Sequence, residues 1–520
     1  MKNIVLTGFM GTGKTSVGRA AARLLERKFV DMDTEIEARA GKTISRIFAE
    51  DGEDAFRQME RDVCRNLSEK QDLVIAAGGG TLIDSRNREL MMKAGKIICL
   101  TASAEEIMRR LDITDVSKRP LLGPPDLRET VETLLRQRRE IYRSFPWQVD
   151  TTDLTIAQVA QRVIEIAETV AIPVRYPGGE YEIRIGDGLL NHLGDLLKGK
   201  ASSHIAIVTN TVVGPLYSAV AEESLRVAGF DPFTCVIPDG ERHKVLATVE
   251  SLYEKFLTGG LNRAGTVVSL GGGVTGDIAG FAAATFMRGV KFVQVPTSLL
   301  GMIDASVGGK TGVDLRQGKN LVGSFKQPSL VLIDPSVLST LPNKEARNGA
   351  AEAIKHGVIA DPDLFATLEN GSVPFTPKLI ARILKVKVRI VEQDPYERGQ
   401  RETLNLGHTV GHAIEQVSKF AVPHGRAVAI GLVAAAQIAV RLELADHDLV
   451  ERIETALSTW KLPIKRPPFF TDEIMAAMVH DKKRKNGRVR FVLPRRIGAV
   501  EVVDNVPQEL IRSVLQQMEE

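Results

Sequence analysis

A glycine-rich loop near the start of the chain has the residues that hold a nucleoside triphosphate. Gly8-Phe9-Met10-Gly11-Thr12-Gly13-Lys14-Thr15 follows a short apolar stretch and precedes a helical pattern, the context that the phosphate-binding pattern G-x-x-x-x-G-K-[ST] requires. Backbone N–H groups of such a loop, and the start of the following helix, point at phosphate oxygens. Lys14 would neutralise β- and γ-phosphate charge, and Thr15 would bind Mg²⁺. We therefore expect ATP at Gly11, Thr12, Gly13, Lys14 and Thr15.

Two aspartates at the end of the next apolar stretch are placed to assist phosphoryl transfer. Asp31 and Asp33 stand two positions apart, so in an extended segment both side chains point to one side. Asp31 suits Mg²⁺ held through water, and Asp33 suits orienting or deprotonating an acceptor hydroxyl. Paired aspartates also commonly do no more than cap a helix, and this alternative stays open. The triplet Gly78–Gly80 after an apolar run favours a site, because glycines let a ligand approach the backbone.

A second group of residues, late in the chain, has the composition of a catalytic metal site. His408 and His412 are four residues apart, hence on one face of a helix, and His424 and Glu352 lie in other glycine-containing segments. Two histidines with one carboxylate are a frequent catalytic zinc set that leaves positions open for substrate oxygens. Any one of these histidines alone is more commonly a surface or core residue, so the prediction rests on the group.

A glycine run in the middle of the chain favours a nucleotide site. Gly271-Gly272-Gly273-Val274-Thr275-Gly276-Asp277 follows an apolar stretch and opens a helical pattern, so pyrophosphate can approach the backbone. The run is not the dinucleotide pattern G-x-G-x-x-G, and alone it is a weak signal. Upstream, Glu241 and Lys244 could hold a ribose and its neighbours, or they could be a turn and the solvated start of a helix.

Basic residues gather in the polar segments around these groups. Because they come from many separate segments, they suit a small, highly anionic substrate better than a polymer. They are Arg288, Lys310, Lys319, Lys355, Lys387, Arg401, Lys482 and Lys483, interleaved with Asp304, Asn320 and Asn405.

The elements that must position these residues are arranged in three regions. Over residues 1–168 short apolar runs alternate with amphipathic helical patterns, which is typical of a parallel α/β unit. Pro173, Pro177, Gly178 and Gly179 then break the helix, and a second α/β region runs to about Asp334. Long helical patterns follow to Val479. We expect a P-loop, nucleoside-monophosphate-kinase-like parallel sheet domain (1–170), a Rossmann-like α/β domain (171–333) and a mainly α-helical domain (334–520).

The strands that we expect are short apolar or alternating runs. In the first region they are Ile4–Leu6, Phe29–Asp31, Leu73–Ala76 and Ile97–Leu100. In the second they are Tyr181–Ile185, Ile205–Thr209, Thr234–Ile237, Thr266–Leu270, Phe292–Val295 and Leu330–Ile333, and a late pair is Val489–Leu493 and Ala499–Val503.

Composition excludes several classes of protein. Lys plus Arg (68) nearly balances Asp plus Glu (65), giving +3 over 520 residues, which gives no case for a nucleic-acid partner. Cys64, Cys99 and Cys235 fit no disulfide or zinc-knuckle spacing and are expected to be reduced and buried. There is no signal-peptide pattern, and the longest apolar stretch, Ala427 to Val440, is too short to span a bilayer. We therefore expect a soluble cytoplasmic protein with no membrane partner.

In residues 1–168 the motifs together resemble the shikimate kinase family. They are the glycine loop, Asp31-Met32-Asp33, Phe56-Arg57, Gly78-Gly79-Gly80, Arg119-Pro120-Leu121-Leu122 and Arg138-Arg139-Glu140-Ile141-Tyr142, in the family's order. The resemblance implies that Asp33 holds shikimate hydroxyls and acts as a catalytic residue, while Arg57, Arg138 and the Gly80 N–H hold the carboxylate. It also implies that Arg119, on a lid of roughly 111–125, closes over the transferred phosphate. The choice of shikimate, rather than gluconate or a nucleotide, as the acceptor substrate rests on this set of arginines.

From about residue 172 to 500 the motifs resemble the 3-dehydroquinate synthase family. They are the glycine run 271–277, Asp304-x-Ser306-Val307-Gly308-Gly309-Lys310-Thr311, Gly318-Lys319-Asn320, Glu352-x-x-Lys355, Leu404-Asn405-Leu406-Gly407-His408-Thr409-x-Gly411-His412 and His424-Gly425.

The second resemblance implies a role for many residues. Glu352, His408 and His424 would bind Zn²⁺ or Co²⁺, and His412 would aid proton transfer near the phosphate, with Lys310 and Lys355 also catalytic. The residues implied to bind NAD⁺ are Asn210, Glu241, Lys244, Gly272, Gly273, Asp277, Thr297, Ser298, Lys310, Lys319 and Thr340. Those implied to bind the substrate, the keto-acid phosphate DAHP, are Arg288, Asp304, Lys310, Lys319, Asn320, Lys355, Lys387, Arg401, Asn405, His412 and one of Lys482 and Lys483.

Three short segments depart from the family pattern. Pro296-Thr297-Ser298-Leu299-Leu300 stands for P-T-T-L-L, and Asp304-Ala305-Ser306 stands for D-S-S. His424-Gly425-Arg426 stands for H-G-E, which places a cation where an acidic neighbour could orient the metal histidine. We expect activity to survive this change.

The two resemblances imply a bifunctional enzyme that phosphorylates shikimate with ATP and Mg²⁺ and converts DAHP into 3-dehydroquinate and phosphate with NAD⁺ and zinc. Alternatives for the larger half are an NAD-dependent polyol dehydrogenase, a related sugar-phosphate cyclase and a degenerate scaffold. The lysine set argues against the first, because a neutral polyol needs no such charge. A homodimer through the synthase half is one option for the oligomeric state.

Overall fold

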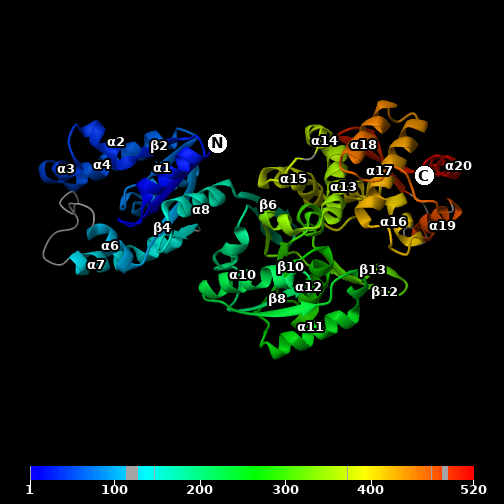
Figure 1. The fold of residues 1–520 in the computed structure, drawn as a ribbon, viewed down its shortest axis with the longest axis horizontal. Coiled ribbons are helices and arrows are strands. Elements are labelled where there is room, and N and C mark those ends of the chain that lie inside the picture. Colours follow the sequence, from blue (N-terminus) through cyan, green and yellow to red (C-terminus); the bar gives the residue numbers. More distant parts are fainter. Residues whose placement is uncertain are drawn as a thin grey trace. The chain divides into compact units, whose positions relative to one another are not determined.

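The chain folds as two compact units, Met1–Thr169 and Val170–Glu520 (Figure 1). The computed structural model describes residues 2–112, 127–145, 147–371, 373–469, 471–482 and 490–519. Cys64, Cys99 and Cys235 are free and buried, as the sequence predicts. Within the described residues no helix has the length and apolar character needed to cross a membrane.

The first unit is built on a five-stranded parallel sheet with strand order β2-β3-β1-β4-β5. The strands are β1 (Asn3–Gly8), β2 (Lys28–Asp31), β3 (Leu73–Ala76), β4 (Gly95–Thr101) and β5 (Gln148–Asp150). β1 and β3 are buried along their whole length, as strands covered on both faces must be. Because parallel strands end at one edge, the glycine loop, Asp31 and the Gly78–Gly80 triplet meet there.

Helices cover the faces of this sheet (Figure 1). The first, α1, starts at Lys14, directly after the left-handed Gly13. The last, α8, begins with a capping box between Thr155 and Gln158, which satisfies the free N–H groups of its first turn. The helices are α1 (Lys14–Leu24), α2 (Met32–Ala40), α3 (Ile44–Glu50), α4 (Gly52–Ser68), α5 (Ser85–Ala94), α6 (Ala104–Asp112), α7 (Leu127–Ser144) and α8 (Ile156–Glu168).

The second unit begins with a seven-stranded sheet of order β6-β7-β14-β11-β10-β8-β9, in which only β6 runs antiparallel to its neighbour. The strands are β6 (Val170–Tyr176), β7 (Gly179–Ile185), β8 (His204–Asn210), β9 (Asp231–Ile237), β10 (Thr266–Gly271), β11 (Lys291–Pro296) and β14 (Leu330–Ile333). Its helices are α9 (Leu193–Leu197), α10 (Gly214–Val227), α11 (Leu246–Thr258) and α12 (Gly273–Thr285).

One strand and one hairpin in this unit correct the interpretation of the sequence. β6 contains Pro173, which we had interpreted only as a helix breaker; the strand tolerates proline because it lies at the sheet edge. β12 (Lys310–Leu315) and β13 (Gly318–Phe325) form an antiparallel hairpin against α12, where the sequence showed only polar turns. The hairpin carries Lys310, Lys319 and Asn320, so these side chains stand on a defined scaffold.

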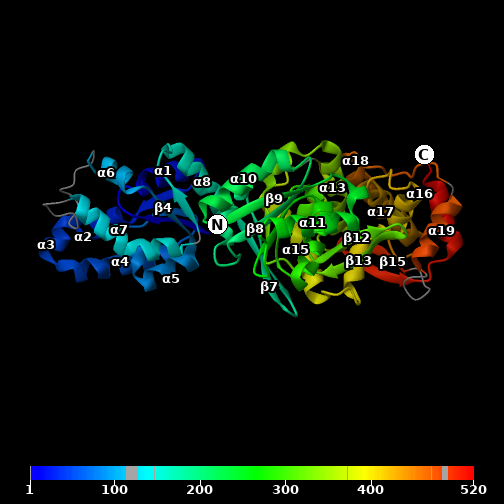
Figure 2. The same cartoon turned by 90° about the horizontal axis from the view of Figure 1, so that it is seen from below.

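The rest of the second unit is mainly helical, as predicted (Figure 2). Its helices are α13 (Asn343–Ala360), α14 (Pro362–Glu369), α15 (Pro377–Gln393), α16 (His408–Val417), α17 (His424–Arg441), α18 (Asp448–Thr459), α19 (Thr471–Lys482) and α20 (Gln508–Gln517). The hairpin of β15 (Arg490–Arg496) and β16 (Ala499–Asp504) stands at the predicted late strand pair. Helices α13 and α17 are buried along most of their length.

Glycines let α13, α16 and α17 approach one another closely. A Cβ atom on Gly431 of α17 would lie 1.9 Å from the carbonyl oxygen of Gly407, which precedes α16. A Cβ on Gly425 would lie 2.3 Å from the carbonyl oxygen of Asn348 on α13, and one on Gly411 would lie 3.1 Å from that of Ala427. Any other residue would push the helices apart. The three helices carry Glu352, His408 and His424, so these glycines set the spacing of the candidate metal site.

We predict that Gly431→Ala destabilises the second unit by about 1–3 kcal/mol, the usual cost of forcing one extra carbon into a packed contact. The sequence contains two tryptophans, Trp147 in the first unit and Trp460 in the second. In a Trp147→Phe background, denaturant unfolding followed by fluorescence therefore reports the second unit alone. Arg426→Ala, an exposed position on the same helix, is the control and should shift the midpoint little. An unchanged midpoint for Gly431→Ala would show that the helices can separate without cost.

Candidate active sites

The glycine loop of the first unit has the geometry of a phosphate cradle. Gly11 and Gly13 have φ values of 79° and 89°, which other residues rarely adopt. The Lys14 ammonium spans the loop and donates to the carbonyl oxygens of Gly8, at 3.0 Å, and Phe9, at 2.9 Å. The Thr15 hydroxyl donates to Asp31 Oδ2 at 2.7 Å. Lysine, hydroxyl and carboxylate thus stand together at the start of α1, where triphosphate and Mg²⁺ would require them.

Of the two predicted aspartates, Asp31 caps a helix, and Asp33 lies beside the glycine triplet. Asp31 caps α2 by accepting the backbone N–H of Asp33 at 3.1 Å, and it also accepts Thr15. Asp33 reaches solvent at the mouth of the loop, but protein atoms surround much of it. This burial, then the charge of Asp31, raises the pKa of Asp33 to about 6 against the opposing effect of Lys14. A carboxylate with such a pKa is a good proton acceptor near neutral pH.

The Gly78–Gly80 triplet is surrounded by the predicted substrate-binding side chains. A Cβ on Gly78 would lie 2.8 Å from Asp33 Oδ1, and one on Gly80 would lie 3.1 Å from Arg57 Nη1. Arg138 is buried, with its guanidinium 5.9 Å from the Phe9 ring centre and 4.0 Å from a Cβ built on Gly79. Asp33, Arg57 and Arg138 therefore come together around a bare backbone surface.

One residue of this cluster was not predicted from the sequence. Glu60 is 2% exposed, accepts Arg57 Nη1 at 2.6 Å and accepts the Thr81 hydroxyl at 2.6 Å. It holds the Arg57 guanidinium beside Gly80. Its spacing of three residues from Arg57 on α4 was the available signal. Arg119 and most of the segment 111–125 lie outside the described residues.

The second unit brings the three predicted metal ligands together. Glu352 comes from α13, His408 from the first turn of α16 and His424 from the first turn of α17. Glu352 Oε1 lies 3.6 Å from His408 Nε2 and 3.3 Å from His424 Nε2. The ligand atoms of all three lie within 4.8 Å of one another. His412 is exposed, and its ring centre lies 5.1 Å from that of His408.

The electrostatics of this cluster are those of a buried charged site. Glu352 is fully buried, which raises its pKa, but Lys355 on the next turn and the two histidines outweigh burial and hold the pKa below its usual range. Burial and then Lys355 lower the pKa of His408. Burial opposes charge on His424 as well, but its bonds to Glu352 and Glu415 raise its pKa to about 10. One carboxylate and two imidazole nitrogens facing one point fit Zn²⁺ or Co²⁺.

The predicted nucleotide residues line the carboxyl ends of the central strands in the second unit. Gly272 caps α12 directly after β10, and a Cβ on it would lie 3.4 Å from Ser298 Oγ. Lys244 is buried and pairs with Asp277 Oδ2 at 2.5 Å and Asn320 Oδ1 at 2.5 Å. This edge of a parallel sheet is the usual place for a nucleotide.

Other predicted nucleotide contacts lie nearby on separate elements. Asn210, at the end of β8, donates to Asp239 Oδ1 at 2.8 Å. Thr297 follows β11, and its backbone N–H donates to Gly271 O at 3.0 Å. The Thr340 hydroxyl lies 2.6 Å from that of Tyr217. Gly273, next in the glycine run, would place a Cβ 3.3 Å from that of Ala305.

A buried network continues from the metal ligands toward the predicted substrate residues. Lys387 donates to Asp304 Oδ1 at 2.8 Å and to its carbonyl oxygen at 2.6 Å. Burial raises the pKa of Asp304, but Lys387 and Lys355 outweigh it and hold the pKa well below the usual range. His356, which we had not assigned, is fully buried, and its Nε2 lies 3.7 Å from Asp304 Oδ1. Asp304, Lys355 and Lys387 thus form one connected group.

The remaining basic residues differ in their surroundings. Lys310 pairs with Glu397 at 2.6 Å, and Lys319 lies 3.3 Å from Glu241 Oε1. Arg401 is buried and donates to the backbone carbonyls of Pro395 and Gly308, so it shapes the loop before β12.

The last predicted substrate contacts lie on three further segments. Arg288 is exposed and follows helix α12. Its backbone is in the left-handed conformation, with φ 68°. Asn405 ends the short helix η8 (Gln400–Asn405) just before His408. Lys482 ends α19, and its side chain, like all of Lys483, lies outside the described residues.

The structure places a carboxylate, not Arg426, against the predicted metal ligand His424. Arg426 is exposed on α17. His424 Nδ1 instead lies 3.2 Å from Glu415 Oε2. The departure from the family pattern at Arg426 therefore leaves an acidic partner of the imidazole in place.

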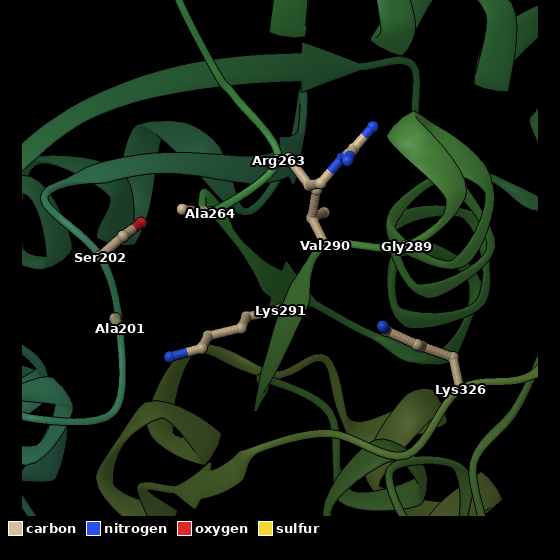
Figure 3. Close-up of a pocket in the computed structure, with 8 residues that line it drawn as sticks. All are labelled: Ala201, Ser202, Arg263, Ala264, Gly289, Val290, Lys291 and Lys326. Carbon is tan, nitrogen blue, oxygen red and sulfur yellow. The ribbon is translucent and has the colours of Figure 1, made fainter.

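A separate hollow of about 380 Å³ lies at the opposite end of the sheet (Figure 3). Arg263, Lys291 and Lys326 line it, at the amino-terminal ends of β10 and β11 and after β13. Lys291 donates to the carbonyl oxygen of Lys200 at 2.6 Å. The predicted nucleotide residues stand at the carboxyl ends of the same strands, so this hollow lies apart from them.

Together these features define two enzyme sites: a P-loop phosphotransferase in the first unit, and a nucleotide- and metal-dependent catalyst in the second. Family models agree. The shikimate kinase model matches residues 10–168, and the N-terminal and C-terminal models of 3-dehydroquinate synthase match 234–348 and 349–484. The chain belongs to the 3-dehydroquinate synthase family and carries a shikimate kinase domain before it.

Curated relatives cover the second unit. The chain is 47% identical over 359 residues to 3-dehydroquinate synthase of Synechocystis sp., which covers 66% of this chain and 99% of that protein. It is 46% identical over 362 residues to 3-dehydroquinate synthase of Nostoc punctiforme, covering 67% of this chain and 100% of that protein.

Solved structures give the same fold. 2-epi-5-epi-valiolone synthase from Streptomyces hygroscopicus subsp. jinggangensis, with NAD⁺ and Zn²⁺ bound, has a TM-score of 0.61 and 30% identity, covering 65% of this chain and 96% of that one. 2-deoxy-scyllo-inosose synthase, complexed with carbaglucose-6-phosphate, NAD⁺ and Co²⁺, has a TM-score of 0.62 and 26% identity, covering 67% of this chain and all of that one.

We predict that the kinase activity falls as the pH drops through about 6. Asp33 must be ionised to accept a hydroxyl proton, and its raised pKa of about 6 means that protonation removes the base at that pH. The measurement is kcat/KM for shikimate between pH 4.5 and 8. An acidic limb with its midpoint near 4 would show that Asp33 titrates as an ordinary carboxyl.

We also predict that metal affinity of the second unit rises with pH. In the metal-free protein His424, with a pKa of about 10, is protonated at neutral pH and must lose its proton to bind an ion. The apparent association constant for Co²⁺ should therefore rise about tenfold per pH unit between about 7 and 9. Titration against a competing chelator of known pH dependence measures it, and a constant value over this range contradicts the prediction.

Proposed function

We propose that this chain catalyses two reactions: ATP-dependent phosphorylation of shikimate to shikimate 3-phosphate, and conversion of DAHP into 3-dehydroquinate and phosphate. The observation that carries the second reaction is the cluster of Glu352, His408 and His424, in the unit that also has the glycine run after β10 and the buried Lys387–Asp304 pair. The family models and relatives support both assignments.

In the kinase site the chain's own residues bind and orient the reactants. Gly11, Thr12 and Gly13 offer backbone N–H groups to ATP, and Lys14 offsets phosphate charge. Thr15 and Asp31 hold Mg²⁺, which offsets the charge developing on the phosphates. Asp33 orients the acceptor hydroxyl and takes its proton. Arg57, Arg138 and the Gly80 N–H grip the shikimate carboxylate, since guanidinium groups bind carboxylates through paired hydrogen bonds. Arg119 is proposed to cover the transferred phosphate.

In the synthase site Glu352, His408 and His424 would hold zinc, or cobalt in its place. Bound there, the ion supplies Lewis acidity to a substrate oxygen. NAD⁺ supplies reversible hydride acceptance, so it is not consumed. The residues proposed to hold it are Asn210, Glu241, Lys244, Gly272, Gly273, Asp277, Thr297, Ser298, Lys310, Lys319 and Thr340.

The basic network is proposed to hold the substrate. Lysine and arginine side chains grip its phosphate and carboxylate and offset the charge that develops as phosphate leaves. His412, exposed beside His408, moves a proton near the phosphate. The contacts proposed are Arg288, Asp304, Lys310, Lys319, Asn320, Lys355, Lys387, Arg401, Asn405, His412 and one of Lys482 and Lys483.

Two observations favour this substrate over the alternatives. The basic residues come from many separate segments and suit a phosphorylated acid better than a neutral polyol, which argues against a polyol dehydrogenase. A related cyclase with another substrate is less well supported, because identity is 47% to 3-dehydroquinate synthase and 30% or 26% to the two other synthases. Net NADH production, or turnover of other sugar phosphates, would favour these alternatives.

We further propose three domains, 1–170, 171–333 and 334–520, in a cytoplasmic protein. Free buried cysteines and the use of ATP support the compartment. A homodimer through the synthase half is supported by apolar side chains on the β12–β13 hairpin, where Leu321 is 41% and Phe325 45% exposed.

The test is a paired assay on purified full-length protein. After dialysis against a strong chelator and return to Mg²⁺ buffer, phosphate release from DAHP should be abolished while shikimate phosphorylation persists. Zn²⁺ or Co²⁺ should restore the first activity, because only the synthase site needs an ion bound by side chains alone. Full synthase activity without the added ion would remove the metal from the mechanism, and no turnover of either substrate would refute the assignment.

A further inference from the structure

Glu415 lies between the predicted metal ligand His424 and Lys319, a predicted nucleotide contact. It stands near the end of α16 with a side chain only 7% exposed. Its Oε2 atom lies 3.2 Å from His424 Nδ1, and its Oε1 atom lies 3.6 Å from the Lys319 ammonium. The two oxygens of one buried carboxylate therefore face two different functional residues.

The contact with His424 fixes the imidazole for metal binding. His424 Nε2 faces Glu352 Oε1, so it must be the nitrogen that carries no proton when an ion binds. Nδ1 then keeps its proton and donates it to Glu415 Oε2. A carboxylate in this position sets the tautomer and the ring orientation, and it makes the other nitrogen a stronger ligand.

The contact with Lys319 links Glu415 to the β12–β13 hairpin. Lys319 stands on this hairpin and also lies 3.3 Å from Glu241, another predicted nucleotide contact. The Phe420 ring centre lies 4.1 Å from its ammonium, within the range of a cation–π contact. Glu241, Glu415 and Phe420 thus surround the Lys319 head.

The backbone after Glu415 is shaped around it. Phe420 N–H donates to the Glu415 carbonyl oxygen at 2.7 Å, and Ser418 Oγ donates to it at 3.0 Å. Lys419 and Phe420 have φ values of 51° and 63°, which non-glycine residues rarely adopt. This turn places the Phe420 ring over Lys319 and brings the chain back to His424.

We propose that Glu415 is a positioning residue that orients the predicted metal ligand His424 and anchors Lys319, so that metal binding and nucleotide binding share one carboxylate. The inference rests on the proposed metal site. It gives His424 the acidic partner that the sequence pattern had placed at Arg426, which is exposed. Glu415 acts through its two neighbours and needs no contact with substrate.

The test compares Glu415→Ala and Glu415→Gln with the full-length parent. Metal-depleted protein is titrated with Co²⁺ in the presence of a competing chelator, and the visible Co²⁺ spectrum is recorded. Glu415→Ala should raise the Co²⁺ dissociation constant by about 10- to 100-fold, the usual effect of removing such a partner. Glu415→Gln keeps an acceptor for Nδ1–H and should show a smaller rise. The NAD⁺ dissociation constant should also increase several-fold in Glu415→Ala, because Lys319 loses its anchor.

Glu369→Gln is the matched control. Glu369 is a largely buried carboxylate of the same helical region that pairs with Arg452 at 2.9 Å. Its Co²⁺ and NAD⁺ affinities should equal those of the parent, and Trp460 fluorescence in the Trp147→Phe background shows that the second unit of each variant is folded. Co²⁺ affinity within twofold of the parent in Glu415→Ala, or an equal loss in Glu369→Gln, overturns the proposal. A parent that binds Co²⁺ but releases no phosphate from DAHP would refute the proposed function instead and leave this comparison intact.

Discussion

The structure of the larger unit depends on how the negative charge of the buried Glu352 carboxylate is balanced by neighbouring side chains. Glu352 is fully buried, and an isolated charge there would be prohibitively unstable. Lys355 one turn along α13, His408 and His424 supply the compensation from three helices. Each partner must reach the carboxylate directly, so the helices must be unusually close. The glycines at 407, 411, 425 and 431 follow from this requirement, because a side chain at any of them would separate the helices.

The kinase site handles charge in the opposite way. Its charged groups stand at the mouth of a loop, where Lys14 rests on backbone carbonyls and Asp33 reaches solvent. Here the ligand itself brings most of the charge, and the protein supplies N–H groups, one lysine and an exposed carboxylate. In the second unit, side chains would hold a Zn²⁺ or Co²⁺ ion. In the first unit, Mg²⁺ would arrive bound to ATP. The two sites thus have different metal requirements within one chain.

The sequence predicted those features that are local. The P-loop, the buried parallel strands and the histidine pair each depend on residues close together in the chain, and the structure has them near the expected positions. The sequence did not predict the features that depend on long-range packing. β6 was missed because its proline is tolerated only at a sheet edge, and the β12–β13 hairpin because its charged residues resemble loop sequence. Glu415 was missed because it meets His424 from another helix, whereas Glu60 lies only three residues from Arg57 and could have been inferred from that spacing.

The contact between Glu415 and His424 explains why the sequence pattern at Arg426 was misleading. A motif places residues by their order, so it assigned the orienting role to the neighbour of His424 in sequence. Arg426, however, stands two residues after His424 on the same helix and is exposed. Glu415 reaches the nitrogen from another helix. A metal site built from several helices is therefore completed across helix contacts, and its tolerance of changes within a motif depends on which side chains those contacts bring together.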